Sequence, residues 1–172
     1  MIVEVNNMNK LIVFFSRSGE NYGVGNIKIG NAKTIALKIK EYTNADIFEI
    51  KRDYEYPKDY KECTSEALKE LNAKAYPRLK EDIDISSYDL IYLCYPNWWG
   101  TYPRVIATFL KQHDFTGKII MPMCTHEGSG MGSSISDLKN ALPNSIIKNG
   151  LAIRGIKAND CDKEIKEWIL NE

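Results

Sequence analysis

The stretch from Leu90 to Pro103 reads LIYLCYPNWWGTYP, and it decides the fold. Its first part, Leu90 to Tyr95, is apolar or aromatic throughout, as expected of a strand buried on both faces of a parallel sheet. A proline follows, so Trp98 and Trp99 fall beyond the strand, at its carboxyl end. Open α/β sheets bind their ligands at this end. The two tryptophans are therefore either core or interface residues or part of a ligand site, and the rest of the chain has to distinguish these interpretations.

Strand-like and helix-like patterns alternate along the whole chain. Further strands are expected at Lys10 to Phe15, Ala45 to Ile50, Lys118 to Cys124 and Ser145 to Ile153. Apolar residues at the helical period predict a helix after each strand, beginning near Asn31, Cys63, Pro103, Met131 and Cys161. The alternation predicts an α/β fold in three layers, a doubly wound sandwich with a five-stranded parallel sheet. Pro122 in the fourth strand favours a bulge or a strand end.

Composition narrows the class of protein. The chain has 172 residues, with 23 basic and 23 acidic side chains and no net charge, which argues against a nucleic-acid partner. No apolar run is long enough to cross a membrane, and the amino terminus does not resemble a secretory signal, so a cytoplasmic location is expected. No linker or repeat divides residues 1–172, which we expect to form a single domain with residues 1–8 as a flexible extension.

The cysteines do not indicate a metal site or a disulfide framework. Cys63, Cys94, Cys124 and Cys161 lie far apart with no CxxC pair, so we expect reduced, mostly buried thiols and no metal. Cys124 and His126 could be proposed as nucleophile and base. Residues two apart at a strand end are poorly placed to hydrogen-bond, so this interpretation is weak.

Three loops follow the first, third and fourth predicted strands: Ser16 to Gly30, Pro96 to Tyr102, and Thr125 to Gly132. In the strand order 2-1-3-4-5 these strands are neighbours, so the loops would converge on one crevice. The first offers hydroxyl groups and a helix start that suit an anion. The second offers flat aromatic faces, and the third offers small residues that let a ligand approach. A phosphate at one end and a planar ring at the other describe a mononucleotide such as FMN.

Two other doubly wound classes fit less well. A dinucleotide-binding Rossmann domain would carry GxGxxG, and the glycines of neither glycine-rich loop have this spacing. A phospho-acceptor receiver domain needs acidic residues after the first strand and an aspartate at the end of the third. Ser16-Arg17 and Tyr95-Pro96 occupy those places.

Several short motifs stand in these loops and at their ends. Ser16 to Gly19 (SRSG) and the segment NAKT from Asn31 together resemble the flavodoxin phosphate loop, interrupted by an insertion from Glu20 to Gly30. GENY, YPNWWGTYP and CTHEGSGMG, in this order, resemble a flavodoxin-like subfamily with such an insertion, and the resemblance extends from Met8 onward. Ala32 stands where the usual loop has threonine, so one hydroxyl contact to phosphate is expected to be missing.

The resemblance implies noncovalent FMN. Its phosphate would be held by Ser16, Arg17, Ser18, Asn31, Ala32 and Lys33, and its ring would lie between two walls. One wall would be Pro96, Asn97, Trp98, Trp99 and Gly100, and the other Thr125, His126, Glu127, Gly128 and Ser129. A Gly100 peptide would meet flavin N5. His126 is a weak catalytic candidate that would donate a proton or hydrogen bond near the flavin carbonyls, or else a structural cap.

Two functions remain open. The first is an oxidoreductase that reduces a quinone or other small acceptor with NAD(P)H, and the zero net charge favours it because steering toward a charged protein partner would be weak. The alternative is a non-catalytic electron carrier between redox proteins. A third interpretation keeps the fold without a flavin. The insertion either folds over the phosphate or contacts a second copy in a homodimer.

Overall fold

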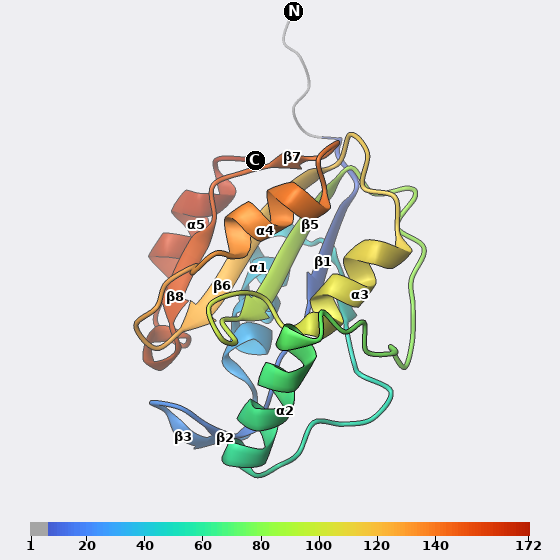
Figure 1. Ribbon diagram of the computed structural model, residues 1–172. Helices are drawn as coiled ribbons and strands as arrows, with labels where there is room; N and C mark the ends of the chain where they lie inside the picture. Colours follow the sequence, from blue (N-terminus) through green and yellow to red (C-terminus); the bar gives the residue numbers. More distant parts are fainter. Residues whose placement is uncertain (1–6) are drawn as a thin grey trace, which may run out of the picture.

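The computed structural model describes residues 7–172, and a parallel sheet forms its centre (Figure 1). Its strands in spatial order are β4 (Asp46–Glu49), β1 (Lys10–Phe14), β5 (Leu90–Pro96), β6 (Ile119–His126) and β7 (Ile146–Ile147). A further strand, β8 (Leu151–Arg154), pairs with the second half of β6, on the residues that follow those paired with β7. If β7 and β8 count as two parts of the fifth strand, the order is 2-1-3-4-5, and the predicted fold is confirmed. Residues 1–6 of the predicted extension lie outside the described residues, whereas Met8 packs against the core.

Helices cover both faces of the sheet, as Figure 1 shows. The helices are α1 (Asn31–Thr43), α2 (Tyr60–Asn72), α3 (Arg104–Gln112), α4 (Ser134–Ala141) and α5 (Asp162–Ile169), with a short 3₁₀ turn η1 (Gly155–Lys157). α1 and α5 pack with one set of strand residues, and α3 and α4 pack with the other set. In β5, for example, Ile91 and Leu93 belong to one core and Tyr92 and Cys94 to the other. Alternate side chains face opposite layers, which explains the unbroken apolar run.

The proline of the fourth strand lies inside β6, not at its end. β7 pairs with residues up to Ile120 and β8 pairs from Met123, so two residues of β6 face the three residues 148–150. β6 itself runs unbroken through Pro122, and the extra residue lies in the segment that joins β7 to β8, so the predicted bulge or strand end is not found in the fourth strand. The carbonyl of Ile120 accepts from the N–H of Lys148 at 2.9 Å, so the backbone of Pro122, two residues on, faces the same neighbour. Pro122 has no backbone N–H to donate, and it faces the break between β7 and β8.

The insertion after β1 forms a hairpin that the sequence did not predict. β2 (Gly19–Asn21) and β3 (Gly25–Ile27) pair antiparallel, apart from the main sheet. Figure 1 shows this hairpin at the end of the molecule where β1 runs out, near the start of α2. Across residues 7–172, no helix is both long enough and apolar enough to span a bilayer.

Candidate functional site

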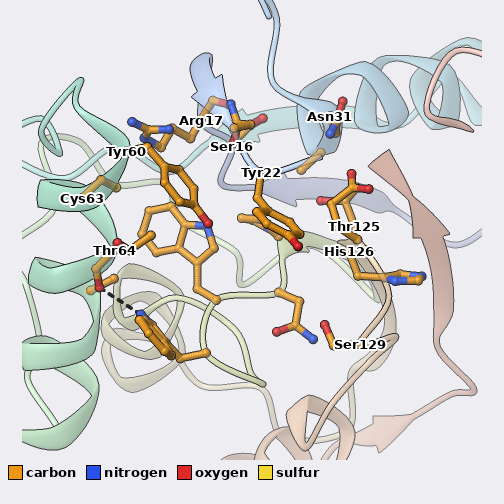
Figure 2. A pocket seen from close by; sticks show the side chains of 18 of the residues that line it. Ser16, Arg17, Tyr22, Asn31, Tyr60, Cys63, Thr64, Thr125, His126 and Ser129 are labelled. Carbon is orange, nitrogen blue, oxygen red and sulfur yellow. Dashed lines mark hydrogen bonds between the residues drawn. The ribbon is translucent and has the colours of Figure 1, made fainter. Parts of the chain in front are cut away.

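A cavity of about 680 Å³ lies where the three predicted loops meet, beyond the carboxyl ends of β1, β5 and β6 (Figure 2). The hairpin and the first half of α2 also contribute to its walls. The lining residues are Ser16, Arg17, Asn21, Tyr22, Asn31, Ala32, Tyr60, Cys63, Thr64, Ala67, Pro96, Asn97, Trp98, Trp99, Thr125, His126, Glu127, Gly128 and Ser129. The convergence inferred from the strand order is thus present in the structure.

One end of the cavity is a cradle of backbone N–H groups at the start of α1. Ser16 Oγ accepts from the N–H of Lys33 at 3.1 Å, which ties the loop after β1 to the helix. Within the described residues, the N–H groups of Arg17 and Ala32 have no acceptor. Gly30 lets these segments meet, because a Cβ there would lie 2.1 Å from Ser16 Oγ and 2.6 Å from the carbonyl oxygen of Arg17. Free N–H groups at a helix N-terminus attract anions.

The Arg17 side chain adds a positive charge to this cradle. Its guanidinium donates to the carbonyl oxygens of Glu20, Pro57 (3.1 Å) and Lys58 (2.8 Å). None of the ion pairs in the described part of the chain involves it. The side chain is held in place by neutral oxygens, so its charge is not neutralised by a carboxylate and is available to an anion.

The two tryptophans lie on a tight turn at the end of β5. Trp98 and Thr101 exchange backbone hydrogen bonds at 2.9 and 3.4 Å, and the φ angles of Trp99 and Gly100 are 56° and 86°. Two consecutive positive φ values make a type I′ turn. A left-handed conformation is unfavourable for tryptophan, so the surrounding contacts must stabilise it.

The turn sends the two indole rings in different directions. Trp98 packs edge-on against Phe15 at 5.2 Å and Tyr56 at 4.9 Å between ring centroids, at the margin of the core. Trp99 is 54% exposed, and its Nε1–H donates to the carbonyl oxygen of Thr64 in α2 at 2.9 Å. Both interpretations of the tryptophan pair therefore apply in part, since Trp98 packs against the core and both tryptophans line the cavity.

A polar network beneath Trp98 fixes its packing partner. The guanidinium of Arg52 lies 3.7 Å from the centroid of Tyr56 and bridges Glu66 and Glu70 at 2.6 and 2.7 Å. The hydroxyl of Tyr56 donates to Glu70 at 2.7 Å, and burial together with this carboxylate raises the pKa of Tyr56. The network holds the Tyr56 ring against Trp98.

Gly100 does not line the cavity, contrary to its predicted role. Its N–H donates to Asn97 Oδ1 at 2.9 Å, and its carbonyl accepts from the N–H of Ser133 at 2.7 Å. A Cβ at Gly132 would lie 2.0 Å from the Gly100 oxygen, which shows how closely the two loops pack. Both the N–H and the carbonyl of Gly100 are thus hydrogen-bonded within the protein, whereas the N–H of Trp99 has no acceptor within residues 7–172.

The third loop presents a neutral imidazole. His126 Nδ1 accepts from the N–H of Gly128 at 2.9 Å, so the ring proton lies on Nε2. Burial lowers the pKa of His126, Arg154 lowers it further, and Glu127 opposes them. His126 therefore caps its own loop through one nitrogen, as the structural interpretation expected, and keeps an N–H donor on the other.

Glu127 brings an unsatisfied acceptor to the cradle. Its Oε1 atom is buried and has no hydrogen-bond partner among the residues that the structure describes. A Cβ at Gly155 would lie 2.0 Å from this oxygen and 2.4 Å from Asn31 Nδ2, so the two side chains lie side by side at the start of α1. A buried carboxylate oxygen without a hydrogen-bond partner is costly.

Two further predicted phosphate contacts lie outside the cavity. Ser18 is exposed to solvent. The amine of Lys33 turns to Glu49 at 3.2 Å, and its N–H is already bound to Ser16. The thiol of Cys124 is fully buried, and burial raises its pKa to about 12, which disfavours the thiolate that a nucleophile beside His126 would need.

Sequence reasoning missed two groups of lining residues. Asn21 and Tyr22 belong to the insertion, where Tyr22 stacks on Tyr60 of α2 with ring centroids 6.5 Å apart. On α2, Cys63 was expected only as the start of a helix and as a buried thiol, and Ala67 lies one turn further on. Glycine-rich loops and a short apolar stripe carry no pattern that distinguishes a cavity wall from a core.

Comparisons with known proteins identify the family of this chain. The family model described as Flavodoxin matches residues 9–172. No curated protein matches the sequence. A flavoprotein structure from Bacteroides eggerthii is 27% identical, with a TM-score of 0.78 over 95% of this chain and 96% of that one.

Two further structures have lower identity and the same fold. A flavoprotein from Bacteroides uniformis is 24% identical with a TM-score of 0.78, covering 95% of this chain and 98% of that one. A flavoprotein from Lactobacillus acidophilus in complex with FMN is 23% identical with a TM-score of 0.71, covering 95% and 99%. Since the family model spans nearly the whole chain, this protein belongs to the flavodoxin family.

Proposed function

We propose that the cavity binds FMN noncovalently and that the protein transfers electrons through it. One observation carries this proposal: the N–H cradle at the start of α1 and the aromatic wall at the end of β5 line the same cavity. Membership in the flavodoxin family and the similarity to the FMN complex from Lactobacillus acidophilus support it. FMN supplies the redox chemistry when bound, and the protein supplies binding and orientation.

The chemical groups around the cavity match the parts of FMN. The N–H groups of Arg17 and Ala32, with the Arg17 charge, suit the phosphate. The carboxylate of Glu127, which lines the cavity, suits a ribityl hydroxyl, which is a donor. Trp99 offers an aromatic face, and the Nε2–H of His126 offers a donor for a ring carbonyl. The volume of about 680 Å³ is in the usual range for cofactor sites.

The reaction we favour is reduction of a quinone or similar small acceptor with NAD(P)H. The net charge of zero gives little long-range steering toward a charged protein partner, whereas small molecules need none. Membership in the flavodoxin family favours the alternative, a carrier that exchanges electrons with other redox proteins.

Steady-state kinetics of the FMN-loaded protein distinguish these functions. The oxidoreductase predicts oxidation of NADH or NADPH with benzoquinone that requires FMN and saturates in both substrates. The protein without added FMN is the control. No turnover with either nicotinamide, together with FMN-dependent electron transfer from a flavoprotein reductase to a haem protein, would contradict the oxidoreductase and support the carrier.

We also propose a cytoplasmic location. Cys63, Cys94, Cys124 and Cys161 are free and buried, as expected in a reducing compartment. Fractionation of the source cells tests this, and recovery from an extracellular or periplasmic fraction would contradict it.

A further inference from the structure

The turn from Trp98 to Thr101, the tryptophan turn, needs support from outside itself. Trp99 has a φ of 56° and Gly100 a φ of 86°, and the left-handed region is unfavourable for a residue as large as tryptophan. Trp99 is also 54% exposed, so burial of its ring offsets this cost only in part. Contacts of the neighbouring residues must therefore hold the turn.

Asp137, in the first turn of α4, supplies such a contact. Its Oδ2 atom accepts from the hydroxyl of Thr101 at 2.6 Å and from the hydroxyl of Ser133 at 2.7 Å. Thr101 is only 7% exposed, so the carboxylate satisfies a hydroxyl that water scarcely reaches. Hydrogen bonds to an ionised acceptor are stronger than those between neutral groups. One carboxylate oxygen thus joins the end of the tryptophan turn to the start of α4.

The bond to Ser133 extends this connection to Gly100. The N–H of Ser133 donates to the carbonyl oxygen of Gly100 at 2.7 Å, so the two residues that follow Trp99 are both tied to the start of α4. Neither Asp137 nor its two partners line the cavity. In the described part of the chain, no ion pair involves Asp137. Its carboxylate is therefore committed to the turn.

We propose that Asp137 is a positioning residue that acts through Trp99. It holds the tryptophan turn in its left-handed conformation, so that the indole stands at the cavity before a ligand arrives. A wall that is already in place costs less to order on binding, so the carboxylate should raise the affinity for FMN without touching it. This effect on affinity rests on the proposed binding of FMN, whereas the effect on the turn does not.

Hydrogen exchange in the FMN-free protein, followed by NMR, tests the effect on the turn. The backbone N–H of Trp98 donates to the carbonyl oxygen of Thr101, and the indole N–H of Trp99 donates to that of Thr64, each at 2.9 Å. Both protons therefore report whether the turn opens. In Asp137→Ala we expect both to exchange at least about 10-fold faster than in the wild type, because two hydrogen bonds to a charged acceptor are lost.

Two controls and a conservative variant make this test selective. The indole N–H of Trp168, which donates to the carbonyl oxygen of Asn149 at 3.0 Å, should change less than about 2-fold in Asp137→Ala, because it lies away from the turn. Glu164→Ala removes an exposed carboxylate from the first turn of α5 and should leave all these rates unchanged. Asp137→Asn keeps an oxygen that accepts hydroxyl protons and should bring the turn to within about 3-fold of wild type.

Fluorescence titration with FMN tests whether the effect passes through Trp99. Asp137→Ala should raise the Kd of FMN about 5-fold, and Asp137→Asn should keep it within about 2-fold. In a Trp99→Ala background, Asp137→Ala should change the Kd by less than about 2-fold, because the residue through which it acts is already missing. An undiminished effect in that background would overturn the proposal.

The outcomes separate this inference from the proposed function. If the wild type does not bind FMN, the proposed function fails, and the exchange rates still decide whether Asp137 holds the turn. Equal acceleration at the turn and at Trp168, or faster exchange with an unchanged Kd of FMN, would contradict a positioning role. Should circular dichroism show that Asp137→Ala is unfolded, Thr101→Val decides, because it removes one hydroxyl and keeps the branched side chain. Wild-type exchange at Trp98 in that variant would overturn the proposal.

Discussion

Replacing Gly30 by alanine tests the phosphate cradle directly. The added Cβ would lie 2.1 Å from Ser16 Oγ and 2.6 Å from the Arg17 carbonyl oxygen, so one segment must move by roughly 1 Å to restore ordinary contact distances. The φ of Gly30 is −61°, so the effect comes from the contact and not from backbone strain. Overpacking of this kind lowers the free energy of unfolding by about 1–3 kcal/mol.

The same displacement moves the N–H of Arg17 away from the phosphate position. A hydrogen bond to a charged group contributes about 1.5–3 kcal/mol, so loss of one or two raises the Kd of FMN roughly 100-fold. Riboflavin has no phosphate, and its Kd should stay within about 3-fold of wild type. Fluorescence titrations with both flavins measure this difference.

Ser18→Ala is the matched control for Gly30→Ala. Its hydroxyl is exposed and outside the cavity, so both flavins should bind as in the wild type. If Gly30→Ala lowered the affinities for FMN and riboflavin equally, the cradle would not hold the phosphate. Wild-type FMN affinity in a correctly folded Gly30→Ala protein would refute the reasoning as well.

Three other predictions concern the walls of the cavity. Trp99→Ala should lower the affinity for FMN about 10-fold through lost stacking, and Trp99→Phe should keep it within about 3-fold of the wild type. Fluorescence titration measures both affinities, and equal effects of the two substitutions would contradict an aromatic wall. Glu70→Gln should lower the free energy of unfolding in urea by about 2 kcal/mol by weakening the bond from Tyr56, whereas exposed Glu81→Gln should change it by less than about 0.5 kcal/mol. The pKa of His126 lies below its usual 6.5, so the unfolded chain takes up the proton first, and wild-type stability should fall as the pH drops below about 6.5. His126→Asn should lose less stability in thermal melts over that range.

The main sheet could be predicted because its strands carry a local signal. Residues 90–95 are apolar on both faces, and only a strand between two helical layers buries both. The strand order 2-1-3-4-5 makes the strands before the three loops neighbours, and the structure has this order. The hairpin in the insertion could not be predicted in the same way. It has no apolar alternation, and its placement depends on contacts with Tyr60 and Glu127, far away in the sequence.

Much of the site was predicted at the level of segments rather than atoms. The loops converge as expected, but which peptide faces the cavity depends on how the loops bond to one another. Gly100 was expected beside the ring, yet Asn97 and Ser133 engage both of its peptides. Lys33 was expected at the phosphate, yet Ser16 accepts its N–H and Glu49 binds its amine. Such partners come from other elements, and no local pattern identifies them.

The most direct measurement of the central claim is the visible absorption spectrum of the purified protein after incubation with FMN and removal of the unbound excess. The account predicts a bound flavin in a ratio near one per chain, released on denaturation as FMN. A protein that remains colourless after this treatment would contradict the assignment of the cavity as a flavin site.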